Sequence, residues 1–94
     1  MIMVDKADGL YNIPNFAVVK LKGRNFPGVV IQGDSLSILR NLSKDILDEI
    51  SIKEGKDSEL YHMALELFEG LDGRLNYYEQ ILKKNKIDIP YSKK

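Results

Sequence analysis

The 94-residue sequence contains no cysteine and only one histidine, His62. Without cysteine the chain can form neither a disulfide scaffold nor a thiolate zinc site, and it has no thiol nucleophile. Its longest apolar runs, such as residues 16–19, are far shorter than the roughly 20 residues that a membrane-spanning helix needs. The sequence does not begin with the basic and then apolar segment of an export signal. We therefore expect a soluble cytoplasmic protein that does not enter a membrane.

The chain also lacks net charge, because 14 basic side chains balance 14 acidic ones. Binding of nucleic acid through counterion release requires many phosphate contacts, so a neutral chain argues against it. Lys20, Lys22 and Arg24 do lie close to Phe26, as basic and aromatic groups do in single-strand binders. The charge is unevenly distributed, however: residues 34–82 carry five basic and eleven acidic side chains. An uneven distribution of this kind can guide a charged partner to one face.

The length supports one domain over residues 1–94, and the sequence patterns predict an α+β fold. Residues 16–32 read as an antiparallel β-hairpin around a Gly- and Pro-containing turn. The apolar periodicity predicts two helices, over residues 35–53 and 58–85, followed by an extended tail over residues 86–94. The expected order is ββαα, with the paired helices covering one face of the hairpin. A third short strand can come from residues 2–4 or 87–89.

Two apolar stripes and their flanking residues define the predicted helices. Asp34 or Ser35 is expected to cap the first helix, Gly55 to end it, and Asp57 or Ser58 to cap the second. Gly70 and Gly73 allow either a break or a close helix contact, but the stripe keeps its phase across both, which favours one continuous helix. The stripes consist of Leu36, Leu39, Leu42, Ile46, Leu47 and Ile50, and of Leu60, Ala64, Leu67, Leu71, Leu75, Tyr78 and Leu82.

Residues 33–36, Gly-Asp-Ser-Leu, resemble the first block of the GDSL esterases, in which the serine is the nucleophile. Such a serine needs a general base, a group that orients the base and oxyanion donors. Only His62 can serve as a histidine base, and later blocks of that family have no counterpart. We therefore interpret Gly33–Leu36 as a strand exit and helix cap, and predict that the protein is not an enzyme. His62 and Glu66 lack further metal ligands, so we expect no metal and no cofactor.

Acidic side chains cluster at helical spacing in both predicted helices, so that they are neighbours on the helix surface. Such carboxylates can act as an acid and a base or hold magnesium, but they are more typical of a solvent-exposed helix face. Our functional interpretation is an acidic patch that binds a basic partner protein. The candidate partner-binding residues are Asp45, Asp48, Glu49, Glu66, Glu69 and Asp72.

Residues 15–36, NFAVVKLKGRNFPGVVIQGDSL, resemble the signature block of a small bacterial family of uncharacterised function. The same segment is more weakly similar to the HicB-type antitoxins, in which a Pro-Gly strand ends in a Gly-Asp-Ser/Thr turn that opens a helix. This resemblance implies a bacterial protein of the immunity or antitoxin type. Together with the acidic helices, it leads us to expect a non-enzymatic protein-binding module that neutralises a toxin. The alternative is an accessory or regulatory subunit that forms a homodimer through its helices.

Overall fold

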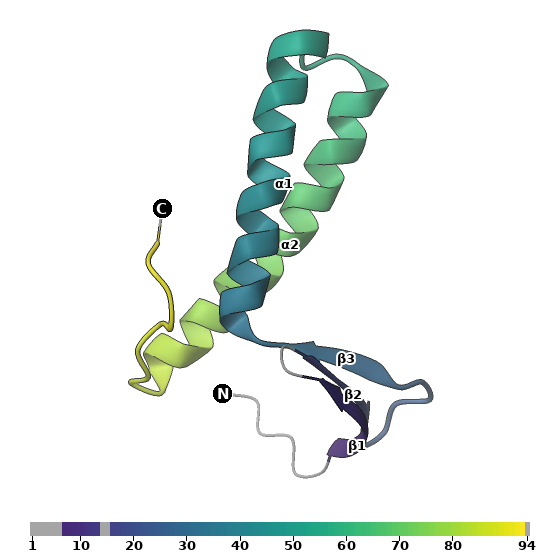
Figure 1. Ribbon diagram of the computed structural model, residues 1–94, viewed down its shortest axis with the longest axis vertical. Coiled ribbons are helices and arrows are strands. Elements are labelled where there is room, and N and C mark those ends of the chain that lie inside the picture. The colour runs from purple at the N-terminus through teal and green to yellow at the C-terminus, as the bar shows by residue number, and fades with distance from the viewer. Residues whose placement is uncertain (1–6, 14–15, 94) are drawn as a thin grey trace.

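The computed structural model describes residues 7–13 and 16–93, and it confirms the α+β class with a β-hairpin followed by two helices. Figure 1 shows the helices as a long antiparallel pair and the sheet at the end of that pair farthest from the α1–α2 connection. The elements are β1 (Ala7–Ile13), β2 (Phe16–Leu21), β3 (Gly28–Ile31), α1 (Gly33–Glu54) and α2 (Glu59–Lys84).

The sheet has three antiparallel strands in the order β1-β2-β3. The predicted hairpin is present as β2 and β3, whose backbones pair from Phe16 opposite Ile31 to Val19 opposite Gly28. The additional strand is β1, whereas the two predicted sources were residues 2–4, which lie outside the described residues, and residues 87–89, which are not a strand. Strand β1 escaped prediction because it contains Asp, Gly and Asn, which are poor strand formers.

The helix boundaries follow the prediction more closely at α2 than at α1. Ser58 caps α2, since its Oγ accepts a hydrogen bond from the Tyr61 N–H at 3.0 Å. Gly55 ends α1 with a φ of 81°, a conformation that favours glycine. The predicted cap of α1 by Asp34 or Ser35 is wrong, because the helix begins earlier and Gln32 is its cap residue. Asp34 lies in the first turn, where the helix dipole favours its negative charge.

Helix α2 runs without interruption through Gly70 and Gly73, as the phase of its apolar stripe predicted. Its contact with α1 contains the largest part of the small core. Among the described residues, the buried apolar side chains are Val19, Leu36, Leu47, Leu75 and Leu82, of which all but Val19 belong to the helices. None of them is completely shielded from solvent.

The contact row of α1 differs from its predicted apolar stripe. This row is spaced by four and three residues, and all of its members are buried or half-buried: Leu36, Arg40, Ser43 and Leu47. Residues spaced in this way form the seam between two paired helices. The seam therefore includes polar residues, and part of the predicted stripe lies outside it. That part is exposed to solvent.

The helices do not cover the sheet as predicted. Val29, Val30 and Ile31 of β3 are all exposed, although Val19 of β2 is buried. The chain is consequently elongated, with principal extents of 46 × 32 × 23 Å and a radius of gyration of 15.9 Å. A compact domain of this length would have a radius of gyration of about 12 Å.

The start of α1, which directly follows the sheet, packs against α2 through a close contact between Gly33 and Tyr78. A Cβ atom built at Gly33 would overlap the ring of Tyr78, so that no larger residue fits there without a shift. Gly33 is itself buried at the start of α1, while Tyr78 lies near the end of α2. The glycine of the Gly-Asp-Ser-Leu segment therefore has a packing role at the base of the helical pair.

Candidate protein-binding surface

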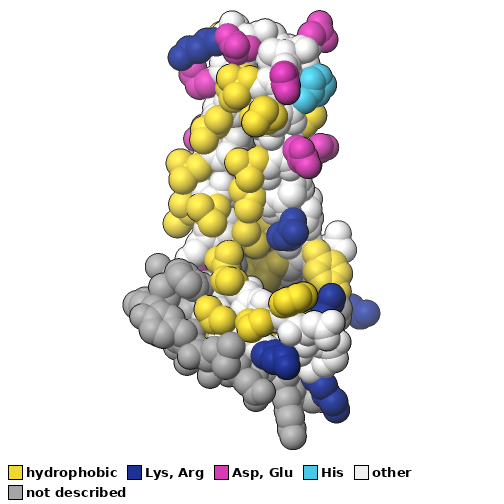
Figure 2. All heavy atoms as spheres, turned by 90° about the vertical axis from the view of Figure 1, so that its right-hand side faces the viewer, with side chains coloured by type: hydrophobic (Ala, Val, Ile, Leu, Met, Phe, Trp, Pro, Cys, Tyr) yellow, Lys and Arg dark blue, Asp and Glu magenta, His cyan; other side chains and the backbone are white. Residues whose placement is uncertain are grey.

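A group of exposed apolar side chains lies along the helical pair, and we refer to it as the apolar face. Its members are between 44% and 62% exposed, which is high for large apolar groups that occur next to one another. Figure 2 shows hydrophobic side chains in a band that follows the helices over most of their length. The apolar face consists of Leu39, Leu42 and Ile46 of α1 and of Leu60, Met63 and Leu67 of α2.

Both helices contribute to the same side of the pair. Leu42 and Ile46 each precede a seam residue of α1, and Leu67 precedes Phe68, which is half-buried in α2. In two antiparallel helices, the positions that precede the seam residues lie on one common side. A groove that Ile46, Ile50, Lys53 and Leu60 line together connects the two helices on this side. The apolar face is therefore continuous from α1 to α2.

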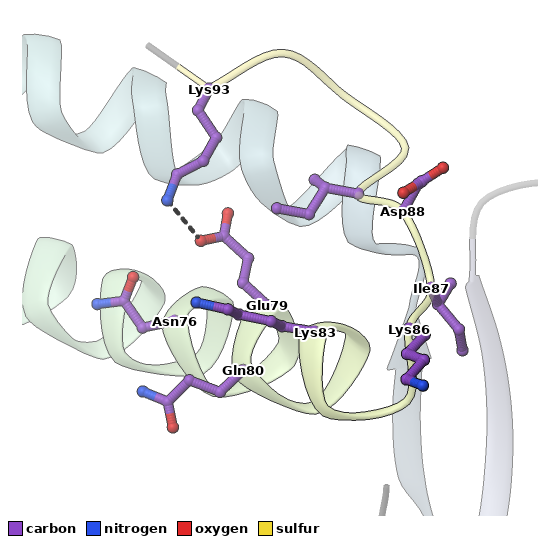
Figure 3. Close-up of a pocket in the computed structure, with 9 residues that line it drawn as sticks. Asn76, Glu79, Gln80, Lys83, Lys86, Ile87, Asp88 and Lys93 are labelled. Carbon is purple, nitrogen blue, oxygen red and sulfur yellow. Dashed lines mark ion pairs between the residues drawn. The ribbon is translucent and has the colours of Figure 1, made fainter.

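Another side of the helical pair is polar and carries the C-terminal tail. The Tyr91 hydroxyl donates a hydrogen bond of 2.7 Å to Glu79 Oε2, and Lys93 Nζ lies 3.2 Å from Glu79 Oε1. Figure 3 shows Glu79 directed from α2 towards Lys93 of the tail. The Glu79 side chain is only 11% exposed, so these two contacts hold a shielded carboxylate. The contacts of Tyr91 and Lys93 with Glu79 hold the C-terminal tail against α2.

The polar seam residue Arg40 is held from two sides. Its Nε donates a hydrogen bond of 2.8 Å to Asp72 Oδ1, and its guanidinium carbon lies 5.1 Å from the centre of the Phe68 ring. A cation above an aromatic ring is attracted by the negative ring face. Arg40 thus joins α1 to α2 through both an ion pair and a ring contact, which explains how a charged residue occupies the seam.

The contact with Glu79 makes the tail sensitive to alkaline pH. Burial raises the pKa of Tyr91, and the hydrogen bond to the Glu79 carboxylate raises it further, because a phenolate cannot donate that bond. Because the pKa is higher in the folded than in the unfolded state, the contact stabilises the fold fully at pH values below the unfolded pKa of about 10. This stabilisation is lost as the pH rises through the folded-state pKa. We expect Tyr91 to ionise at a more alkaline pH than an ordinary tyrosine side chain.

An ultraviolet titration measures this difference directly. The wild-type protein should retain a fraction of its tyrosine absorbance change until the most alkaline part of the titration, and Tyr91→Phe should remove that fraction. Tyr77→Phe is the matched control, since Tyr77 is 50% exposed in α2. A late fraction that survives Tyr91→Phe would contradict the contact.

The structure separates the six predicted acidic residues into different environments. Asp45 and Glu49 line the groove of the apolar face, and Glu66 and Glu69 are exposed on α2. Asp48 is paired with Lys44 at 2.6 Å, Glu49 with Lys53 at 3.5 Å, and Asp72 with Arg40. Asp72 therefore takes part in the contact between the helices. That these six residues bind a partner stays a prediction.

The two residues considered for hydrolase catalysis, Ser35 and His62, lie far apart in the structure. Ser35 lies at the start of α1, next to the sheet, and His62 lies at the start of α2, next to the α1–α2 connection. Sixteen or more helical residues separate these two levels, which corresponds to about 24 Å along the pair. His62 contacts the Tyr61 ring edge to face, with centroids 5.8 Å apart. A Ser35–His62 catalytic pair is therefore geometrically impossible in this conformation.

The described residues contain neither a cluster of metal ligands nor a helix that could span a membrane. No group of three or more His, Asp or Glu side chains in residues 7–13 and 16–93 is placed to hold a metal ion. Over the same residues, neither helix is apolar enough along its length to cross a bilayer. Lys20, Lys22 and Arg24 are exposed at the sheet end of the molecule, together with Phe26 in the turn between β2 and β3.

A model of a family of unknown function, DUF6959, matches residues 5–91 and thus nearly the whole chain. The chain belongs to the DUF6959 family. This agrees with the resemblance of residues 15–36 to an uncharacterised family. No curated protein and no solved structure matches the DUF6959 chain significantly. Its surfaces are therefore the basis for any functional assignment.

The apolar face of this DUF6959 protein was not recognised from the sequence, although a signal for it is present. All of its residues except Met63 belong to the two broad stripes that the sequence pattern assigns to the core. The row Leu36, Arg40, Ser43 and Leu47 has the four-three spacing of a helix seam, which leaves Leu39, Leu42 and Ile46 outside that seam. A stripe too wide for one seam indicates a second contact surface.

Proposed function

We propose that the protein is a non-enzymatic protein-binding module and that the apolar face of its helical pair is the binding surface. The observation that carries this proposal is the exposure of Leu42, Ile46 and Leu67, each of which is more than half exposed. An exposed apolar surface of this extent, bordered by charged residues, is typical of a protein-binding site.

The small core supports the same conclusion. A single chain of this length buries a modest fraction of its surface, and here nearly half of the large apolar side chains of the helices are exposed while only four are buried. A partner that covers the apolar face would remove its side chains from water. This contributes about 25 cal/mol of favourable free energy for each Å² of apolar surface buried. The face therefore gives binding a strong driving force without any change in the fold.

The test compares affinity capture by three forms of the immobilised protein. Leu67→Glu introduces a charge into the apolar face, whereas Ile87→Glu places the same charge beyond the end of α2, at a residue with 45% exposure. We expect wild type and Ile87→Glu to capture the same partner, whether another protein or a second copy of this chain. Leu67→Glu should not capture it. Equal retention by all three forms, or by none, would contradict the proposal.

Neutralisation of a toxin is a second candidate function, supported by the acidity of the outer half of the helical pair. Residues 44–69 carry eight acidic and three basic side chains. The weaker likeness of residues 15–36 to HicB-type antitoxins points to the same class of protein. Coexpression with the product of an adjacent gene tests it: the protein should relieve growth arrest, and the combined Glu66→Gln and Glu69→Gln variant should not.

A further inference from the structure

We propose that the partner on the apolar face is a second copy of this chain, packed antiparallel to the first so that four helices form a two-fold symmetric bundle. This inference rests on the proposed function, since it uses the same face. It adds the identity of the partner and its orientation. Three features of the described residues lead to it: the distribution of charge, the area of the face and the position of the tail.

The described residues form two poles of opposite charge, one at each end of the molecule. Residues 44–69, which form the half near the α1–α2 connection, have a formal charge of −5, from three basic and eight acidic side chains. Residues 16–43 and 70–93, which comprise the other half of the pair together with β2, β3 and the tail, have nine basic and four acidic side chains and hence a charge of +5. The helical residues of this half contribute only +1, so its positive charge comes mainly from the sheet and the tail. Figure 2 shows this division on the face with the apolar band: acidic groups gather at one end, and basic groups lie towards the other.

These poles favour one orientation of a second copy. In an antiparallel dimer, the acidic end of each chain lies over the basic half of the other, and the two-fold axis repeats this favourable arrangement. In a parallel dimer, two acidic ends would meet and repel each other. A protein partner with one sign of charge would match only one half of the face. A second copy matches both halves.

The area of the face is sufficient for a stable dimer. Helix α1 has 22 residues, which corresponds to about 33 Å of length. Two adjacent helices are about 20 Å wide, so the side of the helical pair that contains the apolar face offers on the order of 600 Å² on each chain. A dimer that used this whole side would bury about 1,200 Å² in total. This reaches the lower limit of standard protein interfaces. The tail contacts Glu79 on the polar side and leaves the apolar face open.

The oligomeric state is tested first, by sedimentation of the full chain over a range of concentrations from about 1 to 100 μM. We expect a dimer whose dissociation constant rises about 100-fold or more in Leu42→Glu, because a charge at the centre of an apolar contact would be buried without a partner. Ile87→Glu should leave the dissociation constant unchanged. Circular dichroism should show the same helix content in all three forms, since Leu42 is 54% exposed.

The orientation is tested with a spin label, which is practical because the chain has no native cysteine. Lys56→Cys places the label in the α1–α2 connection. In an antiparallel dimer the two labels lie at opposite ends, more than about 30 Å apart, whereas in a parallel dimer they lie within about 20 Å. A short distance would overturn the antiparallel arrangement.

The outcomes also separate this inference from the proposed function. A monomer at all concentrations would overturn the second copy as the partner, but binding of another protein through Leu67 would still be measurable in the capture experiment. A dimer that Leu42→Glu leaves intact would overturn the use of the apolar face by a second copy. A dimer that is weakened by Leu42→Glu and also by added salt supports both the face and the charge arrangement.

Discussion

Leu75→Ala is expected to lower the free energy of unfolding by about 2–5 kcal/mol, because it removes a buried leucine and leaves a cavity in the seam between the helices. Leu75 is only 5% exposed and belongs to the small core. A domain of this size has a total stability of about 5–14 kcal/mol, so the loss is a large part of it. Urea denaturation followed by circular dichroism measures the change.

Leu67→Ala is the matched control, because it makes the same chemical change on the same helix at a residue that is 58% exposed. Both substitutions are best compared in a Leu42→Glu background, where each chain unfolds alone. There Leu67→Ala should cost less than about 1 kcal/mol. Equal losses for the two variants would mean that the helices pair through a different side from the one described.

Gly33→Ala is expected to lower the free energy of unfolding by about 1–3 kcal/mol, because the added methyl group overlaps the ring of Tyr78. The control is Gly73→Ala in α2, where an added Cβ meets no atom within 4 Å. That substitution should raise the stability by up to about 1 kcal/mol, since alanine favours the helix. Thermal and urea denaturation of the two variants measure these opposite changes.

A double-variant cycle assigns the effect of Gly33→Ala to the ring. When Tyr78→Leu is present, the extra methyl group has more room, and the two losses should not add. Strict additivity would show that Gly33 is required for the backbone and not for the contact with Tyr78. In either case Ser35→Ala should change stability by less than about 0.5 kcal/mol, since no hydrogen bond of the Ser35 hydroxyl is found within residues 7–13 and 16–93.

Local signals in the sequence predicted most of the secondary structure. The β-branched runs predicted β2 and β3, and the glycine at position 55 and serine at position 58 predicted the α1–α2 connection. The unbroken phase of the α2 stripe predicted one helix through Gly70 and Gly73. Each of these features depends on residues that are neighbours in the chain, so their physical causes are visible in the sequence.

Features that depend on distant residues were predicted less well. The cap of α1 is displaced because the chain turns into the helix at Gln32, and this start places Gly33 against Tyr78, 45 residues later. The seam accepts Arg40 because Asp72 and Phe68 are positioned to hold it. Hydrophobic periodicity alone could not indicate which part of a broad stripe faces α2 and which part faces solvent.

The candidate binding surface also depends on how distant residues pack, so the sequence predicted it less well. The sequence directed attention to six acidic residues, but three of these are in ion pairs and only the groove residues Asp45 and Glu49 border the apolar face. The leucines and isoleucine that form the face were assigned to a core larger than the chain contains. Their exposure becomes apparent only when the helical pair and the sheet are seen to lie end to end (Figure 1).

The short α1–α2 connection, residues 55–58, also has a kinetic consequence. Contacts between the two helices can form outward from this connection, one turn after another, so each step closes only a short additional loop. A newly made chain can therefore complete its helical pair without a partner, at a rate that does not depend on concentration. The association that we propose on the apolar face is bimolecular, so the time for which that face would stay uncovered is set by the abundance of the protein in its cell.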